Sequence, residues 1–176
     1  RGLGDVYKRQ VKDIAGNAVN AALSDAGIGI GDIESAYFAN ATQGALEGQY
    51  LIPGQVALRS IGLQGVPVVN VENACASAST AFSLACKDIR SGDSSVALAV
   101  GAEKMITPDK AKNMAVFDGA IDVNGRDETL DGLMALSDGF ELPPEATAET
   151  GMRSVFMDVY AAIAKHHMKL HGTTQR

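Results

Sequence analysis

The sequence predicts an α/β fold with a mostly parallel sheet that helices cover on both faces. Short apolar segments of strand length alternate along the chain with longer segments whose apolar residues recur at helical spacing. Two of the short segments are almost continuously apolar, which is typical of strands buried on both faces. This alternation favours parallel strands that are joined through helical crossovers.

The first half of the chain supplies two helices and a strand. Residues 11–26 carry apolar side chains at helical spacing, and Gly27 follows as a stop, which predicts a helix. Residues 35–40 predict a short strand after a turn. Residues 55–61 predict a short helix, because Pro53 stands near its start.

The middle of the chain supplies the two apolar strands and the helix between them. Residues 66–71 are rich in valine and predict a buried strand, with Pro67 near the beginning, where a missing N–H is tolerated. Residues 76–90 predict a helix that ends at Gly92, and residues 95–100 predict the next strand.

The remaining segments differ in character. Residues 107–149 are acidic, rich in glycine and only weakly periodic, so we expect an irregular functional loop. The apolar face of residues 152–170 predicts a long helix. Residues 1–10 carry a net charge of +2 and no periodicity, and they resemble translated sequencing-adapter DNA. We expect them to be non-native, the alternative being a mobile native terminus.

Composition excludes several classes of protein. The net charge of −6 is unsuited to nucleic-acid binding through a basic face. A hydrophobic content of 46% is enough for a core, but no apolar run is long enough to span a membrane. The two cysteines form no disulfide framework, so we expect a reducing compartment, the cytoplasm.

Cys75 is the candidate catalytic residue. It follows a predicted strand and directly precedes a predicted helix of very small residues, so it lies on a tight turn at a helix N-terminus. The helix dipole and the unpaired N–H groups there favour a thiolate and can bind an oxyanion. The alternative is a buried structural cysteine. Asn73 and Ser77 are expected to serve the turn as caps.

The residues around Cys75 closely resemble the thiolase superfamily, in particular its sterol-carrier-protein-x type and acetyl-CoA acetyltransferases. The resemblance is carried by the sequences VENACASASTA (71–81), IRSG (89–92) and VALAVGAEKM (96–105). Weaker similarities in the same order are LSDAG (23–27), IPGQ (52–55) and YAAIAKHHMKLHGTT (160–174). The resemblance therefore extends from residue 11 to the end of the chain, and residues 11–176 are interpreted as one incomplete domain.

The resemblance implies a fold and a chemistry. The fold would be the N-terminal half of the thiolase fold, a layered α-β-α arrangement with a mostly parallel sheet around a buried helix. Cys75 would take the acyl group from a coenzyme A thioester, for Claisen condensation or for thiolytic cleavage of a 3-ketoacyl-CoA. Ala78 stands where the family often has glycine, which changes local packing. Family members are homodimers or homotetramers, and no cofactor or metal is implied.

The resemblance also implies what this sequence lacks. The family's base histidine and the region that handles the α-carbon proton lie in the second half of its chain, which has no counterpart here. We therefore expect a fragment that is inactive alone and that leaves apolar surface exposed. The alternative function is a non-catalytic thiolase-like module that binds acyl-CoA or a partner, and a ketoacyl-synthase relative fits less well.

Other candidates have simpler interpretations. Cys86 falls about 16 Å along the predicted helix from Cys75, too far for a disulfide, and is expected in the core. His166, His167 and His171 fit a helix end that they complement electrostatically. Residues 122–128 resemble a Ca²⁺ loop, but Arg126, Asp127 and Leu133 occupy positions that a ligand or glycine requires. Glu103 and Met105 are expected to position neighbouring groups.

Overall fold

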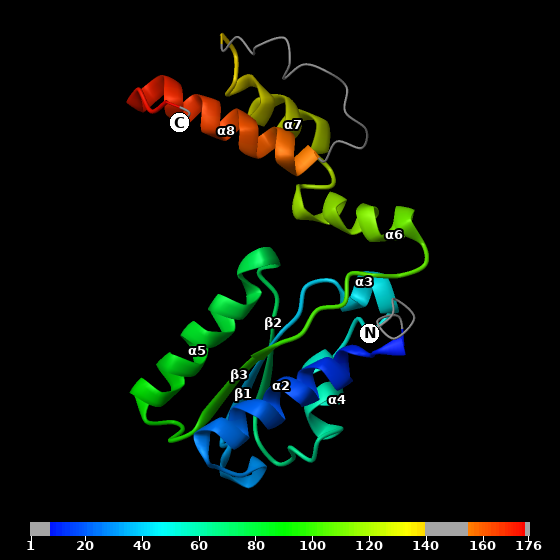
Figure 1. Ribbon diagram of the computed structural model, residues 1–176, viewed down its shortest axis with the longest axis vertical. Helices are drawn as coiled ribbons and strands as arrows, with labels where there is room; N and C mark the ends of the chain where they lie inside the picture. Colours follow the sequence, from blue (N-terminus) through cyan, green and yellow to red (C-terminus); the bar gives the residue numbers. More distant parts are fainter. Residues whose placement is uncertain (1–7, 140–154, 175–176) are drawn as a thin grey trace. The chain divides into compact units, whose positions relative to one another are not determined.

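The computed structural model describes residues 8–139 and 155–174. It divides into two compact units, one ending at Phe117 and the other beginning at Asp118. The first unit is an α/β layer structure (Figure 1). Its regular elements, in chain order, are α2 (Val11–Ala26), η1 (Ile30–Asp32), β1 (Ser35–Ala39), α3 (Gln43–Glu47), α4 (Pro53–Arg59), β2 (Val68–Val71), η2 (Ala74–Ala76), α5 (Ser77–Ser91), β3 (Ala97–Gly101) and α6 (Lys110–Ala115).

The sheet has the order β2-β1-β3, with both pairs parallel, as the sequence predicts. At the end of the central strand, Ala39 is level with Val71 of β2 on one side and with Gly101 of β3 on the other. All three strands therefore end at one edge. In parallel sheets this carboxyl edge is where ligands bind.

Helices α2 and α4 cover one face of the sheet (Figure 1). Ala36 and Phe38 of β1 point to this face, because alternate residues of a strand lie on the same side. Phe38 and Leu58 are fully buried at the centre of this core. The apolar spacing of α2 places Val11, Ala15 and Val19 against it, and Gly27 ends the helix in the left-handed conformation.

Helix α5 covers the other face (Figure 1). Ala39, Val71 and Ala81 are buried there, with Tyr37 and Leu84 packed against them. The far end of α5 is anchored by Asp88, whose carboxylate accepts a hydrogen bond from the Ser35 hydroxyl at the start of β1. The layered α-β-α arrangement is thus confirmed.

Two expectations about burial are wrong within this chain. Residues 66–71 are not a fully buried strand, since β2 is an edge strand on which Val69 is 43% exposed and Asn70 is exposed. Helix α5 is not enclosed, since Phe82 on its outer side is 65% exposed. Periodicity reveals that a side chain is apolar, but not which part of a fold covers it.

The segment after β3 corrects the expected irregular loop. Residues 107–149 contain α6, η3 (Val116–Ala120) and α7 (Arg126–Ala135) in their described part, up to residue 139. Helix α7 packs against α8 (Val155–His171), the long C-terminal helix (Figure 1). The weak apolar periodicity of α7 hid it, because the helix carries no fully buried residue. The predicted start of α8 near residue 152 lies outside the described residues.

No helix among the described residues is both long enough and apolar enough to cross a membrane.

Gly54 marks the tightest packing of the first unit. A Cβ atom at this position would lie 2.6 Å from Phe38 Cβ and 2.7 Å from Asn70 Oδ1. We expect Gly54→Ala to destabilise the chain by about 1–3 kcal/mol, because neither neighbour is a free side-chain end. Urea unfolding measures this. The control is Gly31→Ala, where a Cβ would meet nothing within 4 Å; equal losses in both variants would contradict the packing.

The contact of Asp88 predicts a pH dependence. Hydrogen bonds from Ser35 and then Ser94 lower the pKa of Asp88 below its ordinary value of 3.8. A lowered folded-state pKa stabilises the fold at neutral pH, and this stabilisation is lost as the pH falls through the folded-state value. Asp88→Asn should therefore lower the unfolding midpoint in urea at pH 7, and the gap to the wild type should narrow below about pH 4.

The control for Asp88 is Asp93→Asn, because Asp93 lies in the turn after the same helix and its carboxylate accepts only a local hydrogen bond among those observed, from Ser91. A gap between wild type and Asp88→Asn that stays constant from pH 7 to pH 3 would exclude the ionised carboxylate as its cause.

Candidate functional site

The candidate site is the carboxyl edge of the sheet, where three segments meet. The turn with Cys75 follows β2, the segment 40–42 follows β1, and Glu103 follows β3. The backbone N–H of Asn40 donates to Val71 O at 3.2 Å, and that of Ala102 donates to Ala39 O at 3.2 Å. A Cβ on Gly101 would lie 3.6 Å from the Cβ of Ala78, so the first turn of α5 packs directly over the strand ends.

Cys75 lies in a short 3-10 turn between β2 and α5, and it is exposed. The residue before it, Ala74, has φ +45°, in the left-handed region that a residue with a Cβ adopts only at a cost of about 1–2 kcal/mol. Strained backbone next to a reactive side chain is typical of functional turns, where surrounding contacts hold the conformation. The sequence gives no sign of this strain, since glycine does not occupy the position.

Ser77 holds the turn in place. Its buried hydroxyl accepts a hydrogen bond from the Asn73 N–H at 2.8 Å and donates to Ala74 O at 2.7 Å. The Asn73 amide donates to Thr80 Oγ1 at 3.0 Å, and the Glu72 carboxylate accepts from the Ala74 N–H at 2.7 Å. Asn73 and Ser77 therefore serve the turn, as expected, although the Asn73 side chain reaches α5 instead of capping it.

The turn changes the expected supply of N–H groups. Helix α5 begins at Ser77, two residues after Cys75, and not at residue 76. The N–H of Ala76 donates to Asn73 O and the N–H of Ser77 donates to Ala74 O, so these two donors are engaged. Of the unpaired N–H groups expected at this helix N-terminus, those of Ala76 and Ser77 are thus already bonded within the 3-10 turn.

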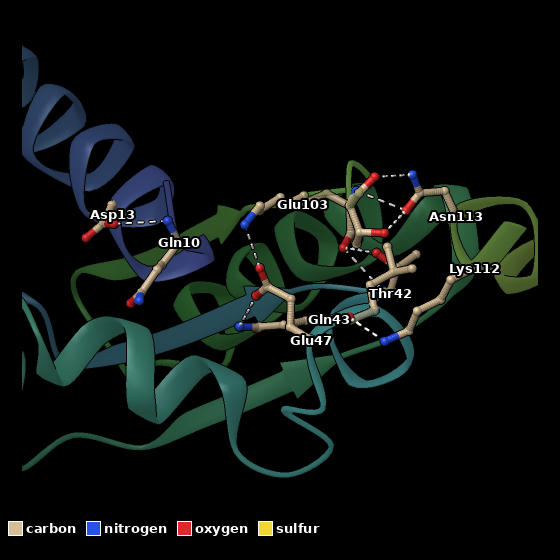
Figure 2. Close-up of polar contacts among 11 residues, drawn as sticks. Gln10, Asp13, Thr42, Gln43, Glu47, Glu103, Lys112 and Asn113 are labelled. Atoms are coloured by element: carbon tan, nitrogen blue, oxygen red, sulfur yellow. Dashed lines mark hydrogen bonds and ion pairs between the residues drawn. The ribbon is translucent and has the colours of Figure 1, made fainter. Parts of the chain in front are cut away.

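Glu103 fastens the segment after β1 to the end of β3. Its carboxylate accepts four hydrogen bonds, from Asn40 Nδ2 at 2.9 Å, from the N–H of Ala41 at 2.9 Å, and from the N–H and hydroxyl of Thr42. Figure 2 shows Glu103 and Thr42 pointing toward each other. The Asn40 amide also donates to Ala102 O at 2.7 Å. Glu103 thus positions its neighbours, as expected.

Sequence reasoning missed Asn40 and Thr42. Asn40 ends the predicted strand 35–40 and Thr42 follows two residues later, and a polar pair at a strand end was the available signal. Met105 is half-buried after β3. Beyond the segment 40–42, Lys104 Nζ lies 3.1 Å from Glu47 Oε1, which connects the same strand end to α3.

Cys86 is half-buried on α5, not fully inside the core, and both cysteines are free. Among the described residues no group of three His, Cys, Asp or Glu side chains is placed to hold a metal ion. Asp122 accepts hydrogen bonds from the N–H groups of Asn124 and Gly125, so residues 122–125 form a turn that leads into α7, which begins at Arg126.

The three histidines lie on α8, in the second unit. The rings of His167 and His171 have centroids 4.5 Å apart, and His167 Nδ1 lies 3.1 Å from Thr173 Oγ1 just past the helix end. This is a helix-end arrangement, as expected.

Comparison with known proteins decides the family. The family model described as "Thiolase, N-terminal domain" matches residues 2–160. The chain belongs to the thiolase family. The strand–turn–cysteine–helix arrangement at the carboxyl edge of a parallel sheet is therefore a feature of a thiolase N-terminal domain.

Relatives with two kinds of names are similar to this chain. "Non-specific lipid-transfer protein-like 2" of Caenorhabditis elegans is 34% identical over 173 residues, which are 97% of this chain and 37% of the relative. "Sterol carrier protein 2" of Bos taurus is 29% identical over 96% of this chain and 27% of its own length. "Acetyl-CoA acetyltransferase" of Methanocaldococcus jannaschii is 29% identical over 97% of this chain and 37% of its own length.

The thiolase-family chain thus spans between about a quarter and just over a third of the length of these relatives. These matches support the sterol-carrier-protein-x branch that the residues around Cys75 indicate.

Proposed function

We propose that Cys75 is the nucleophile of a thiolase-type acyltransferase and accepts the acyl group of an acyl-CoA. The observation that carries the proposal is the position of Cys75. It is exposed on a strained turn at the carboxyl edge of a parallel sheet, two residues before helix α5 begins. The name of the archaeal relative, an acetyl-CoA acetyltransferase, supports the same reaction class.

Of the groups in this chain, the proposed first step uses the Cys75 thiolate and the N-terminal end of α5. The Cys75 thiolate attacks the thioester carbonyl carbon, a bond from Sγ to that carbon forms, and the bond to the coenzyme A sulfur breaks. The departing thiolate takes up a proton, so the products are an acyl-enzyme and free coenzyme A. The positive end of the α5 dipole favours the attacking thiolate and the oxyanion. Transfer of the acyl group to a second thioester, or to coenzyme A, completes the reaction.

The turn that carries Cys75 needs little rearrangement for the proposed reaction. Ser77 and Asn73 hold the turn before any substrate binds, so Cys75 is already positioned for attack. Ala78 packs over the strand end at Gly101, and this contact holds the beginning of α5 against the sheet.

Incubation with acetyl-CoA tests the proposal. Peptide mass spectrometry should find an acetyl group on Cys75, with one equivalent of coenzyme A released, while multiple turnovers are not expected from this chain alone. An absence of acylation, in a chain that binds acetyl-CoA by calorimetry, would contradict the proposal and support the binding module.

The binding-module alternative is favoured by one observation, the lipid-transfer name of the C. elegans relative.

A further proposal concerns assembly: we propose that the complete protein is a homo-oligomer, since β2 is an edge strand with an exposed Val69.

A further inference from the structure

We propose that Glu103 is a positioning residue for Cys75. It would act by fixing the segment 40–42, which joins the ends of all three strands beside the Cys75 turn. The inference rests on the proposed function, in which Cys75 is the nucleophile, but it makes its own prediction about the cysteine's environment.

The Glu103 carboxylate accepts four hydrogen bonds. Three of the four donors to Glu103 belong to Ala41 and Thr42, and two of them are consecutive backbone N–H groups. Such consecutive N–H groups form a concave anion site. A side chain that makes this many charge-assisted bonds fixes the backbone it contacts.

The segment 40–42, which Glu103 fixes, lies between the ends of β2 and β3. Asn40 directly follows the central strand β1 and makes contacts on both sides. Its backbone N–H donates to Val71 O of β2, and its amide donates to Ala102 O and to the Glu103 carboxylate. Its carbonyl Oδ1 accepts from the Gln43 N–H at 2.9 Å, at the start of α3. Asn40 is therefore a bridge between β2 and β3.

Contacts lead from this bridge to the Cys75 turn. Val71, which accepts from Asn40, is the last residue of β2, and the strained turn begins at Ala74 after two intervening residues. On the other side of the bridge, Gly101 lies against both Ala39 and Ala78 of α5. A shift of the segment 40–42 would therefore move both the entry to the Cys75 turn and the support of the helix that follows it.

The chain contains a matched control for Glu103. Glu34 precedes β1, and its carboxylate accepts from the N–H of Ser95, which precedes β3, at 2.6 Å. It thus connects the same two strands at the opposite edge of the sheet. Glu34→Gln and Glu103→Gln make the same chemical change, but only Glu103 lies at the edge with Cys75.

The experiment measures alkylation of Cys75 by iodoacetamide, followed by peptide mass spectrometry, in wild type, Glu103→Gln and Glu34→Gln. Circular dichroism first establishes that all three are folded. We expect Glu103→Gln to slow Cys75 alkylation about tenfold at pH 7.5 and to shift the midpoint of its pH profile upward, with Glu34→Gln within twofold of wild type.

The direction of the pH shift separates positioning from simple charge removal. Loss of a nearby negative charge alone would shift the midpoint downward, because a thiolate is easier to form without it. A downward shift, an unchanged rate, or equal slowing in both variants would overturn the inference. If Glu103→Gln does not fold, Glu103→Asp replaces it, and a Cys75 rate equal to that of wild type would likewise overturn it.

The same experiment tests the proposed function through a different comparison, that of wild-type Cys75 with a free thiol. Wild-type Cys75 that reacts no faster than a free thiol would contradict that function, while the ratio between the two variants still decides the role of Glu103.

Discussion

Replacing Cys75 by serine is expected to abolish acyl-enzyme formation from acetyl-CoA. A serine hydroxyl has no thiolate character near neutral pH, and the helix dipole that favours a thiolate cannot ionise an alcohol. We expect at least about a hundredfold loss of acylation rate, measured as coenzyme A release in a single turnover. The fold should not change, because the Cys75 side chain is exposed.

The control for this variant is Cys86→Ser. Cys86 is half-buried on α5, the helix that follows the Cys75 turn, and takes no part in that turn. It should leave acylation of Cys75 within twofold of wild type. Acylation that persists in Cys75→Ser and disappears in Cys86→Ser would identify Cys86 as the nucleophile and contradict the proposal.

Replacing Phe38 by alanine is expected to have the largest effect on stability. Phe38 is fully buried at the centre of the sheet, against α4. Truncating a buried phenylalanine costs about 3–5 kcal/mol, because transfer free energy is lost and a cavity remains. This is a large part of the total stability of an ordinary domain. Urea unfolding followed by circular dichroism measures the loss, and a variant that is unfolded without denaturant meets the same expectation.

Phe82→Ala is the matched control for Phe38, since Phe82 is 65% exposed on the outer side of α5. We expect it to change the free energy of unfolding of this chain by less than about 0.5 kcal/mol. A cost at Phe82 similar to that at Phe38 would show that the outer face of α5 is covered in solution, for instance by another copy of the chain.

Local sequence patterns predicted the strands and helices of the first unit well. The valine-rich segments and the glycine stops are short-range signals, and they correctly predicted β1, β2, β3 and the ends of α2 and α5. The patterns could not reveal that β2 is an edge strand, because the position of a strand in a sheet depends on long-range pairing. They also missed α7, since a helix without a buried face has little periodicity to detect.

The candidate site was predicted in part for the same reason. The strand–turn–cysteine–helix pattern is contiguous, so Cys75, Asn73 and Ser77 could be recognised together. The bridge formed by Asn40 and Glu103 joins residues that are 63 positions apart, and no local pattern connects them. The left-handed conformation of Ala74 was equally hidden, because it is imposed by the contacts of Ser77 and Glu72.

The most direct test of the account is the reactivity of Cys75 in the unmodified chain. The rate constant for its alkylation by iodoacetamide at pH 7 should exceed that of glutathione by about tenfold or more, as the proposed role of Cys75 as a nucleophile requires. Cys86, measured in the same sample, should react more slowly than glutathione. A Cys75 that reacts no faster than glutathione would contradict the claim that this turn activates its cysteine.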